Sequence, residues 1–98
     1  MEKLLTDLKN EGKSDGTWSV YILRCADDTL YTGITNDSPR RLQQHNAGTA
    51  SRYTRSRLPV EMVYQESQAT RSLALKRELA IKALSRKQKE LLIKTVES

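Results

Sequence analysis

The chain has 98 residues and a formal net charge of +5, and 37% of its residues are hydrophobic. This length is enough for one domain and too short for two, and the composition is that of a folded chain with a modest core. A single cysteine, Cys25, excludes an internal disulfide, and no apolar run resembles a membrane span or a signal peptide. We therefore expect a cytoplasmic protein without a membrane partner.

The first expected elements are two strands of an antiparallel hairpin. Residues 1–17 read as an N-terminal leader, loosely ordered or forming a short helix, and residues 18–96 as a single domain. Trp18–Cys25 is rich in β-forming residues, a short turn follows, and Leu30–Thr35 is the second strand. The short connection between the strands favours antiparallel pairing.

A helix is expected directly after this hairpin. Asp37 or Ser38 supplies the capping side chain and Pro39 stands at the first helical position, where its missing N–H costs nothing. The helix should run to about Asn46 and end at Gly48.

The second half of the chain predicts one strand and two helices. A basic loop over residues 49–58 leads to a strand at Val60–Gln65, with Val60, Met62 and Tyr64 on one face. A helix from about Ala69 to Leu84 comes next. Its expected buried stripe is Leu73, Ala80, Ile81 and Leu84.

The last expected helix begins at Ser85, with Gln88 three residues on as its capping-box partner. Its apolar side is expected to be Leu91, Leu92 and Val96. The resulting order is β-β-α-β-α-α. The fold class is thus α/β in the α+β sense, a small sandwich with a three-stranded antiparallel-type sheet flanked by helices.

Positive charge is concentrated in two segments. Residues 39–57 carry five arginines and no acid, and residues 67–89 carry seven basic residues and one acid. Clustered Lys and Arg gain affinity for phosphates by releasing counterions, so the partner expected is nucleic acid. A solvated basic face without a ligand is the alternative.

Three groups of residues could carry chemistry, and each also has a structural interpretation. Tyr21 and Tyr31 lie on neighbouring strands near Gly33, a mid-strand glycine that often marks a close approach. Arg41 and His45 share one helix face, where they could bind a phosphate and move a proton, or form a surface pair.

Glu78 is the only acid between residues 67 and 89. It could anchor a divalent cation, since Mg²⁺ often takes one or two protein carboxylates and keeps water and phosphate oxygens as its other ligands. Its structural alternative is an ion pair with Lys82, four residues on.

Read together, these residues resemble the GIY-YIG nuclease superfamily, and most of all its small stand-alone bacterial members. The two signatures are Val20-Tyr21-Ile22 and Tyr31-Thr32-Gly33. The later blocks, in chain order, are Arg40–Gly48, Ser51–Arg57 and Lys76–Arg86. The resemblance covers residues 18–93. Val20 replaces a glycine and Thr32 an isoleucine of the usual signatures.

The resemblance implies a role for each candidate. Tyr21 would be the general base or would orient the attacking water, and Tyr31 would contact the scissile phosphate. Arg41 would stabilise the developing charge, His45 would assist Tyr21, and Glu78 would be the single protein ligand of one Mg²⁺ or Mn²⁺ ion. A cationic neighbourhood is expected to lower the pKa of Tyr21. The nucleic-acid-binding residues would be Arg40, Arg52, Tyr53, Arg55, Arg57 and Lys82, with Tyr53 available to stack on a base.

The function expected is metal-dependent phosphodiester cleavage of DNA by a structure-directed or weakly specific endonuclease, in a setting such as repair or recombination. No small-molecule organic cofactor is expected. One alternative is a non-catalytic DNA- or RNA-binding accessory module, and another is a basic domain that docks onto an acidic protein.

Overall fold

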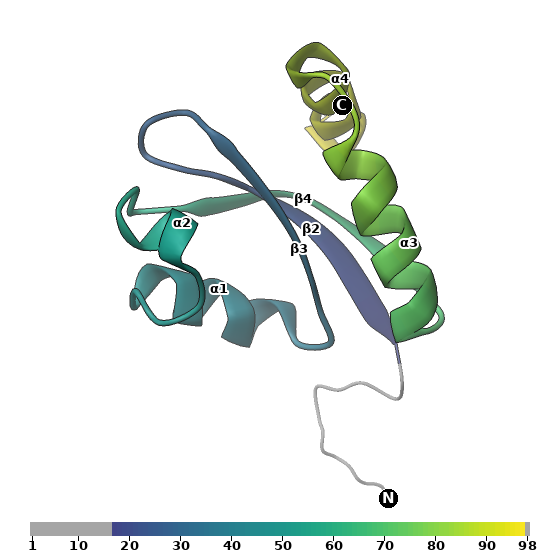
Figure 1. Cartoon of the computed structure of the whole chain (residues 1–98), viewed down its shortest axis with the longest axis horizontal. Coiled ribbons are helices and arrows are strands. Elements are labelled where there is room, and N and C mark those ends of the chain that lie inside the picture. Colours follow the sequence, from purple (N-terminus) through teal and green to yellow (C-terminus); the bar gives the residue numbers. More distant parts are fainter. Residues whose placement is uncertain (1–16, 98) are drawn as a thin grey trace, which may run out of the picture.

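A three-stranded antiparallel sheet forms the centre of the computed structural model, which describes residues 17–97 (Figure 1). Its strands are β2 (Trp18–Arg24), β3 (Leu30–Thr35) and β4 (Glu61–Gln68), in the order β3-β2-β4. The predicted hairpin is confirmed, and its first strand ends one residue before Cys25. The expected leader lies outside the described residues, apart from Thr17.

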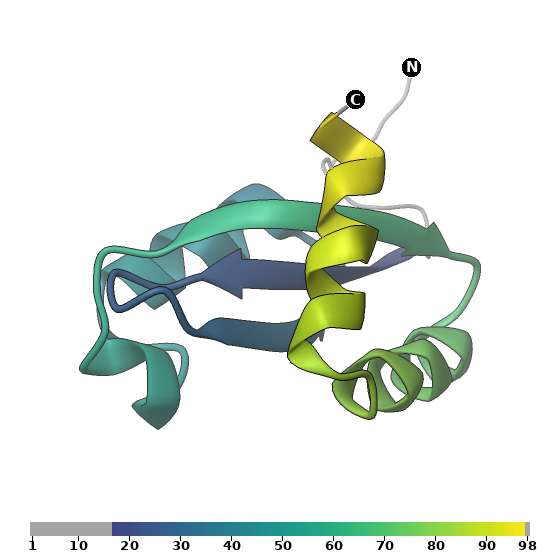
Figure 2. The same ribbon diagram turned by 90° about the horizontal axis from the view of Figure 1, so that it is seen from above.

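Four helices flank the sheet: α1 (Ser38–Asn46), α2 (Arg52–Arg55), α3 (Arg71–Lys82) and α4 (Arg86–Glu97). α1 and α2 lie on one side of the sheet and α3 on the other (Figure 1), and α4 runs across the strands (Figure 2). This confirms the α+β sandwich. Residues 49–58 are more ordered than expected, because Ser51 accepts hydrogen bonds from the backbone N–H groups of Tyr53 and Thr54 and so starts α2.

The predicted caps of two helices are confirmed. Asp37 accepts a hydrogen bond from the backbone N–H of Arg40 at the start of α1. Before α4, the backbone N–H of Gln88 donates to Ser85 Oγ at 3.2 Å, and the backbone N–H of Ser85 donates to Gln88 Oε1 at 2.9 Å. This reciprocal pair is a capping box, and it satisfies two N–H groups that the helix itself leaves unpaired.

The sheet separates two small hydrophobic cores. Val20 and Ile22 of the central strand point to one face, where Ala74, Ile81 and Ile93 cover them. The alternate residues of β2 point to the other face and pack with Cys25, Val60 and the partly buried Leu42 of α1. Because successive strand residues face opposite sides, β2 is buried on both faces.

The expectation that Val60, Met62 and Tyr64 share a face is wrong. Ile22 pairs with Tyr64, but its neighbour Leu23 pairs with Met62, so the register shifts between them. A β-bulge of this kind places one extra residue in a strand and reverses the alternation beyond it. Tyr64 therefore packs with the α3 and α4 core, and Val60 and Met62 with the α1 core.

The buried stripes of the last two helices also differ from the expectation. In α3 Ile81 of the expected stripe is buried, but the other buried residue is Ala74, and Leu73 is 44% exposed. In α4 the fully buried residue is Ile93, and Leu91 and Val96 are more than half exposed. The helix therefore turns the side that contains Ala74 and Ile81 toward the sheet.

No helix within residues 17–97 has the length and apolar character needed to cross a membrane.

Candidate active site

Tyr21 and Gly33 are direct partners in the pairing of β2 with β3. A Cβ atom on Gly33 would lie 2.6 Å from the Tyr21 hydroxyl oxygen and 2.7 Å from its Cζ. Only glycine therefore lets the Tyr21 ring cross β3. The close approach predicted at Gly33 is made by the side chain of Tyr21.

The Tyr21 hydroxyl meets His45, which projects from the last turn of α1 and is 1% exposed. The Tyr21 oxygen lies 2.9 Å from His45 Nε2, and His45 Nδ1 lies 2.9 Å from Thr54 Oγ1. The Thr54 hydroxyl donates to the backbone carbonyl of Ser51 at 3.4 Å, so its oxygen is left to accept from Nδ1–H. When Thr54 accepts from Nδ1–H, the ring is the Nδ1–H tautomer and His45 Nε2 accepts the hydroxyl proton of Tyr21.

Thr54 was not among the residues singled out from the sequence, although it is fully buried at the centre of this chain of hydrogen bonds. Its neighbours Arg52, Tyr53 and Arg55 were predicted to bind nucleic acid because they are charged or aromatic. The available signal was Ser51, since an N-cap at this position starts α2 and places the residue three positions on beside it.

Tyr31 completes an aromatic cluster with Tyr21 and His45. The Tyr31 ring centroid is 5.2 Å from that of His45 and 6.5 Å from that of Tyr21. All three side chains thus meet on the α1 side of the sheet, as their positions in the sequence predict.

Tyr53 extends this cluster by stacking on Tyr31, with centroids 6.0 Å apart and ring planes 25° apart. The guanidinium of Arg57 lies 4.0 Å from the Tyr53 ring centroid and pairs with the Asp27 carboxylate at 3.0 Å. A base stacking on Tyr53 would have to displace one of these neighbours. Arg52 and Arg55 are exposed, without a carboxylate partner in the described part of the chain.

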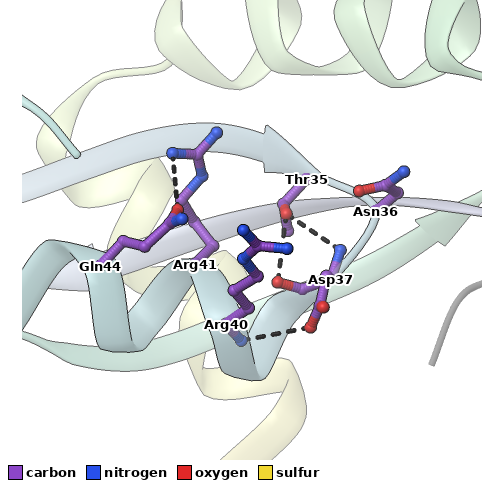
Figure 3. A pocket seen from close by; sticks show the side chains of 6 residues that line it. All are labelled: Thr35, Asn36, Asp37, Arg40, Arg41 and Gln44. Atoms are coloured by element: carbon purple, nitrogen blue, oxygen red, sulfur yellow. Dashed lines mark hydrogen bonds between the residues drawn. The ribbon is translucent and has the colours of Figure 1, made fainter. Parts of the chain in front are cut away.

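The charges of Arg41 and Glu78 shift the pKa of Tyr21 in opposite directions. Arg41 donates a hydrogen bond to the side-chain oxygen of Gln44 at 3.2 Å (Figure 3). Its positive charge favours the phenolate of Tyr21, and the negative charge of Glu78 disfavours it. Two helices on opposite faces of the sheet therefore bring opposite charges to bear on one hydroxyl.

The pKa of Tyr21 is raised above its ordinary value, contrary to the expectation from its cationic surroundings. Burial is the largest cause, the neighbouring Tyr31 adds to it, and Arg41 opposes it only in part. Burial, followed by the charge of Arg41, lowers the pKa of His45. At neutral pH the pair is thus a protonated tyrosine hydrogen-bonded to a neutral histidine.

Glu78 lies on the face of α3 that packs against the sheet, since it falls between the buried Ala74 and Ile81 at helical spacing. Its side chain is 14% exposed and its carboxylate lies 3.3 Å from Lys82 Nζ, so the ion pair expected as the structural alternative is present. The buried stripe expected from the sequence placed Glu78 at its flank, whereas in the structure Glu78 lies within the buried side of α3.

The donor set around Glu78 fits a hydrated divalent cation and does not form an all-protein cage. Residues 17–97 hold no group of three or more His, Cys, Asp or Glu side chains that could bind a metal. Mg²⁺ can be held by one carboxylate when water and phosphate oxygens complete its shell. Glu78 is therefore the residue that would hold such an ion, in exchange for Lys82.

A cavity of about 280 Å³ lies beside this cluster. It is lined by Leu30, Tyr31, Thr32, Tyr53, Lys82 and Lys89. Lys82 and Lys89 would attract a negatively charged group, and the rest of the lining is largely apolar and aromatic. The cavity therefore suits a ligand that carries both negative charge and an aromatic group.

Comparison with known proteins identifies the family. Residues 17–91 match the model of the GIY-YIG catalytic domain. The chain belongs to the GIY-YIG family. It is 54% identical over 81 residues to a UPF0213 protein of Desulfotalea psychrophila, covering 82% of this chain and 74% of that protein. It is 49% identical over 75 residues to a UPF0213 protein of Staphylococcus aureus, covering 76% and 92%.

Two solved structures share the fold. The solution NMR structure of a protein from E. faecalis is 44% identical, with a TM-score of 0.59, and covers 89% of this chain and 91% of that one. The solution NMR structure of a UPF0213 protein from Bacillus halodurans is 38% identical, with a TM-score of 0.53, and covers 81% and 84%.

Membership of the GIY-YIG family points to nuclease chemistry and to a nucleic-acid substrate, and nucleases of this family generally use a divalent metal ion. The family does not by itself fix the kind of nucleic acid, the ion or the biological setting.

Proposed function

We propose that this protein is a metal-dependent endonuclease that hydrolyses phosphodiester bonds of DNA, with weak sequence specificity and a role in DNA repair or recombination. The observation that carries this proposal is the hydrogen-bonded chain from Tyr21 through His45 to Thr54, placed between the charges of Arg41 and Glu78. A neutral imidazole is an acceptor that can also take up the proton of the tyrosine hydroxyl, and this is the property that the proposal uses.

In the proposed reaction, the Tyr21 hydroxyl receives a proton from the attacking water while its own proton passes to His45 Nε2. The water oxygen bonds to phosphorus as the bond to the leaving oxygen breaks, and the leaving oxygen takes a proton from solvent. His45 then gives the proton that it gained back to solvent, which restores the neutral ring. Tyr21 stays neutral throughout, which suits a group whose raised pKa disfavours the phenolate.

The remaining residues act on charge and position. Arg41 donates hydrogen bonds to the phosphate oxygens as negative charge builds up on them. Tyr31 lies beside the same phosphate and helps to place it. Glu78 would hold the metal ion, which when bound would supply positive charge to the phosphate oxygens and the leaving oxygen.

Glu78→Gln tests the proposal, because it keeps the size of the side chain and removes its charge. The wild type should cleave at least one DNA in a panel of single-stranded, nicked, branched and duplex substrates, and only with added Mg²⁺ or Mn²⁺. Glu78→Gln should lower cleavage by about 10²-fold or more, and Mn²⁺ binding measured by electron paramagnetic resonance should weaken in parallel.

Glu61→Gln is the matched control, since Glu61 is an exposed glutamate of β4 with no ion pair in the described part of the chain. It should cleave like the wild type. Equal activity of Glu78→Gln and the wild type would refute the proposal. Tight DNA binding by a wild type that cleaves nothing would instead identify a binding module.

A further inference from the structure

A second, polar cavity of about 310 Å³ opens where the end of β3 meets the start of α1. It is lined by Thr35, Asn36, Asp37, Arg40, Arg41 and Gln44. Figure 3 shows the side chains of Arg40 and Arg41 leaving consecutive positions of the helix beside the end of the strand. The cavity thus receives two guanidinium groups from one turn of helix.

Neither guanidinium forms an ion pair with a carboxylate within residues 17–97. Arg24, Arg57, Arg77 and Arg86 pair with carboxylates, whereas Arg40 and Arg41, like Arg52, Arg55 and Arg71, have no such partner among residues 17–97. Arg41 donates to the amide oxygen of Gln44, and within the described part of the chain no side chain accepts a hydrogen bond from the Arg40 guanidinium.

The one acid of the lining, Asp37, is engaged with the helix, since its carboxylate accepts from the backbone N–H of Arg40 at 3.2 Å. The lining therefore keeps a net charge of +1, two arginines against one aspartate. An unpaired arginine pair at a polar cavity favours an anion with several acceptor oxygens, and phosphate matches the guanidinium geometry.

Arg41 belongs to both the cavity and the candidate active site, because its charge acts on Tyr21 and on His45. A ligand of the cavity is thus next to any phosphate that Arg41 holds for cleavage. Consecutive residues of a helix point about 100° apart, so Arg40 cannot contact the same oxygens as Arg41 in the same way.

We infer that this cavity binds a phosphate adjacent to the scissile one on the same strand, with Arg40 as its main ligand. This inference rests on the proposed function and deepens it. The substrate must then continue for at least one phosphate beyond the cleaved bond, and isolated phosphodiesters should be poor substrates.

Binding of short oligonucleotides tests the inference without cleavage, using the Glu78→Ala protein in the presence of a chelator. Each phosphate in turn is replaced by an uncharged methylphosphonate. The same series is measured for Glu78→Ala with Arg40→Gln, and for Glu78→Ala with Arg71→Gln as the matched control. Arg71 begins α3 on the other side of the sheet, contacts Trp18 and has no carboxylate partner in the described chain.

Arg40→Gln should weaken binding roughly tenfold and should reduce the slope of log K against log salt by about 0.7–0.9. At one linkage, the methylphosphonate should weaken binding to the parent but cost nothing further in the Arg40→Gln protein. Arg71→Gln should show no such coupling at any linkage.

Additive effects of Arg40→Gln and the methylphosphonate at every linkage would overturn the inference, as would a loss no larger than that of Arg71→Gln. Cleavage by the wild type with Mn²⁺, mapped on the unmodified oligonucleotide, reports separately on the proposed function. Coupling at one linkage without cleavage would thus retain the phosphate site and reject the nuclease. Coupling only at a linkage remote from the cleaved bond would reject the adjacent position.

Discussion

His45 is the only histidine of the chain, so its imidazole signals report on the candidate site without ambiguity. The hydrogen bonds to Tyr21 and Thr54 require opposite roles from its two ring nitrogens. In the proposed reaction Thr54 would act only through this orientation, as a positioning residue. Which nitrogen carries the proton decides whether Tyr21 can pass its own proton on.

Thr54→Val should leave the shape of the site almost unchanged and remove the acceptor for Nδ1–H. We expect nitrogen chemical shifts of His45 to move from the Nδ1–H tautomer toward the Nε2–H tautomer, and kcat to fall by roughly 10²-fold with little change in KM. The unpaired buried N–H should also cost about 1–3 kcal/mol of stability.

Thr54→Ser provides the control, because its hydroxyl can accept the same hydrogen bond. It should restore the wild-type tautomer and most of the activity. A Thr54→Val protein with unchanged nitrogen shifts and full activity would show that the threonine only fills space.

At the scale of the elements, the β2–β3 hairpin is the frame that places Tyr21. Gly33→Ala should introduce a Cβ that collides with the Tyr21 ring, since the contact would be 2.6 Å. We expect a loss of about 1–3 kcal/mol in the free energy of unfolding, measured by urea denaturation, and loss of cleavage as the ring leaves His45.

A double-mutant cycle separates this collision from a general effect on the strand. In a Tyr21→Leu background the ring is gone, and the further cost of Gly33→Ala should be much smaller. An equal cost in both backgrounds would mean that the alanine disturbs β3 itself, and that Gly33 has no special relation to Tyr21.

The same elements show how far local sequence patterns determine this fold. The hairpin, the start of α1 and the capping box of α4 follow from signals within a few residues, and each is confirmed. The shift of register in β4 was not predictable in this way, because a bulge depends on how Leu23 and Met62 meet across the sheet.

The residues of the candidate site also fall into those that local sequence patterns predict and those that they do not. Tyr21, Tyr31 and His45 were predicted from motif spacing, and the structure brings their side chains into contact. Their catalytic roles stay predictions. The contact of Thr54 with His45 and the burial of Glu78 depend on how separate elements pack together, so local patterns do not predict them. The pKa of Tyr21 is raised because the side chain is buried, and counting charges along the chain does not reveal burial.

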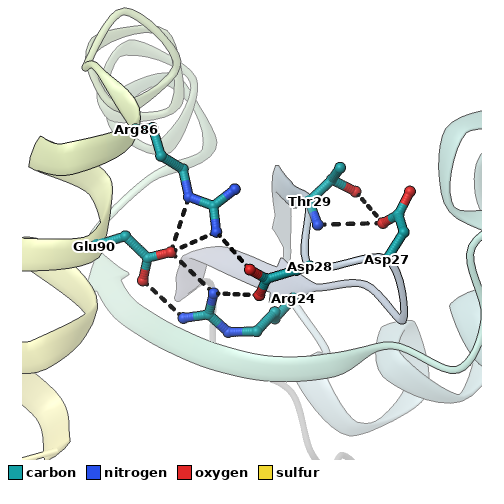
Figure 4. A network of polar contacts seen from close by, with 6 residues as sticks. All are labelled: Arg24, Asp27, Asp28, Thr29, Arg86 and Glu90. Carbon is teal, nitrogen blue, oxygen red and sulfur yellow. Dashed lines mark hydrogen bonds and ion pairs between the residues drawn. The ribbon is translucent and has the colours of Figure 1, made fainter.

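At the scale of the whole molecule, a network of charged side chains joins the hairpin turn to the last helix (Figure 4). Arg24 donates to both carboxylate oxygens of Glu90 at 2.8 and 2.9 Å, and Arg86 pairs with Glu90 and with Asp28. The network ties β2 to α4 across a distance of 66 residues in the sequence. It lies outside the candidate site, so its loss should change stability and leave the chemistry intact.

The pH dependence of stability tests this network. Hydrogen bonds from Arg24 and Arg86 lower the pKa of Glu90 from 4.5 to about 2, although partial burial opposes them. A depressed carboxylate pKa stabilises the folded chain above the unfolded value of about 4.3, and this stabilisation is lost as the pH falls from there toward 2.

Glu90→Gln should therefore lower the free energy of unfolding by roughly 1 kcal/mol at pH 7, and the difference from the wild type should shrink steadily between pH 4.5 and pH 2. Urea denaturation of both proteins across this range measures it, with Glu61→Gln expected to have little effect at pH 7. A difference that stays constant down to pH 2 would show that Glu90 contributes through packing and not through its charge. Because the network is partly exposed, salt should also reduce the difference at pH 7, whereas a packing contribution would persist.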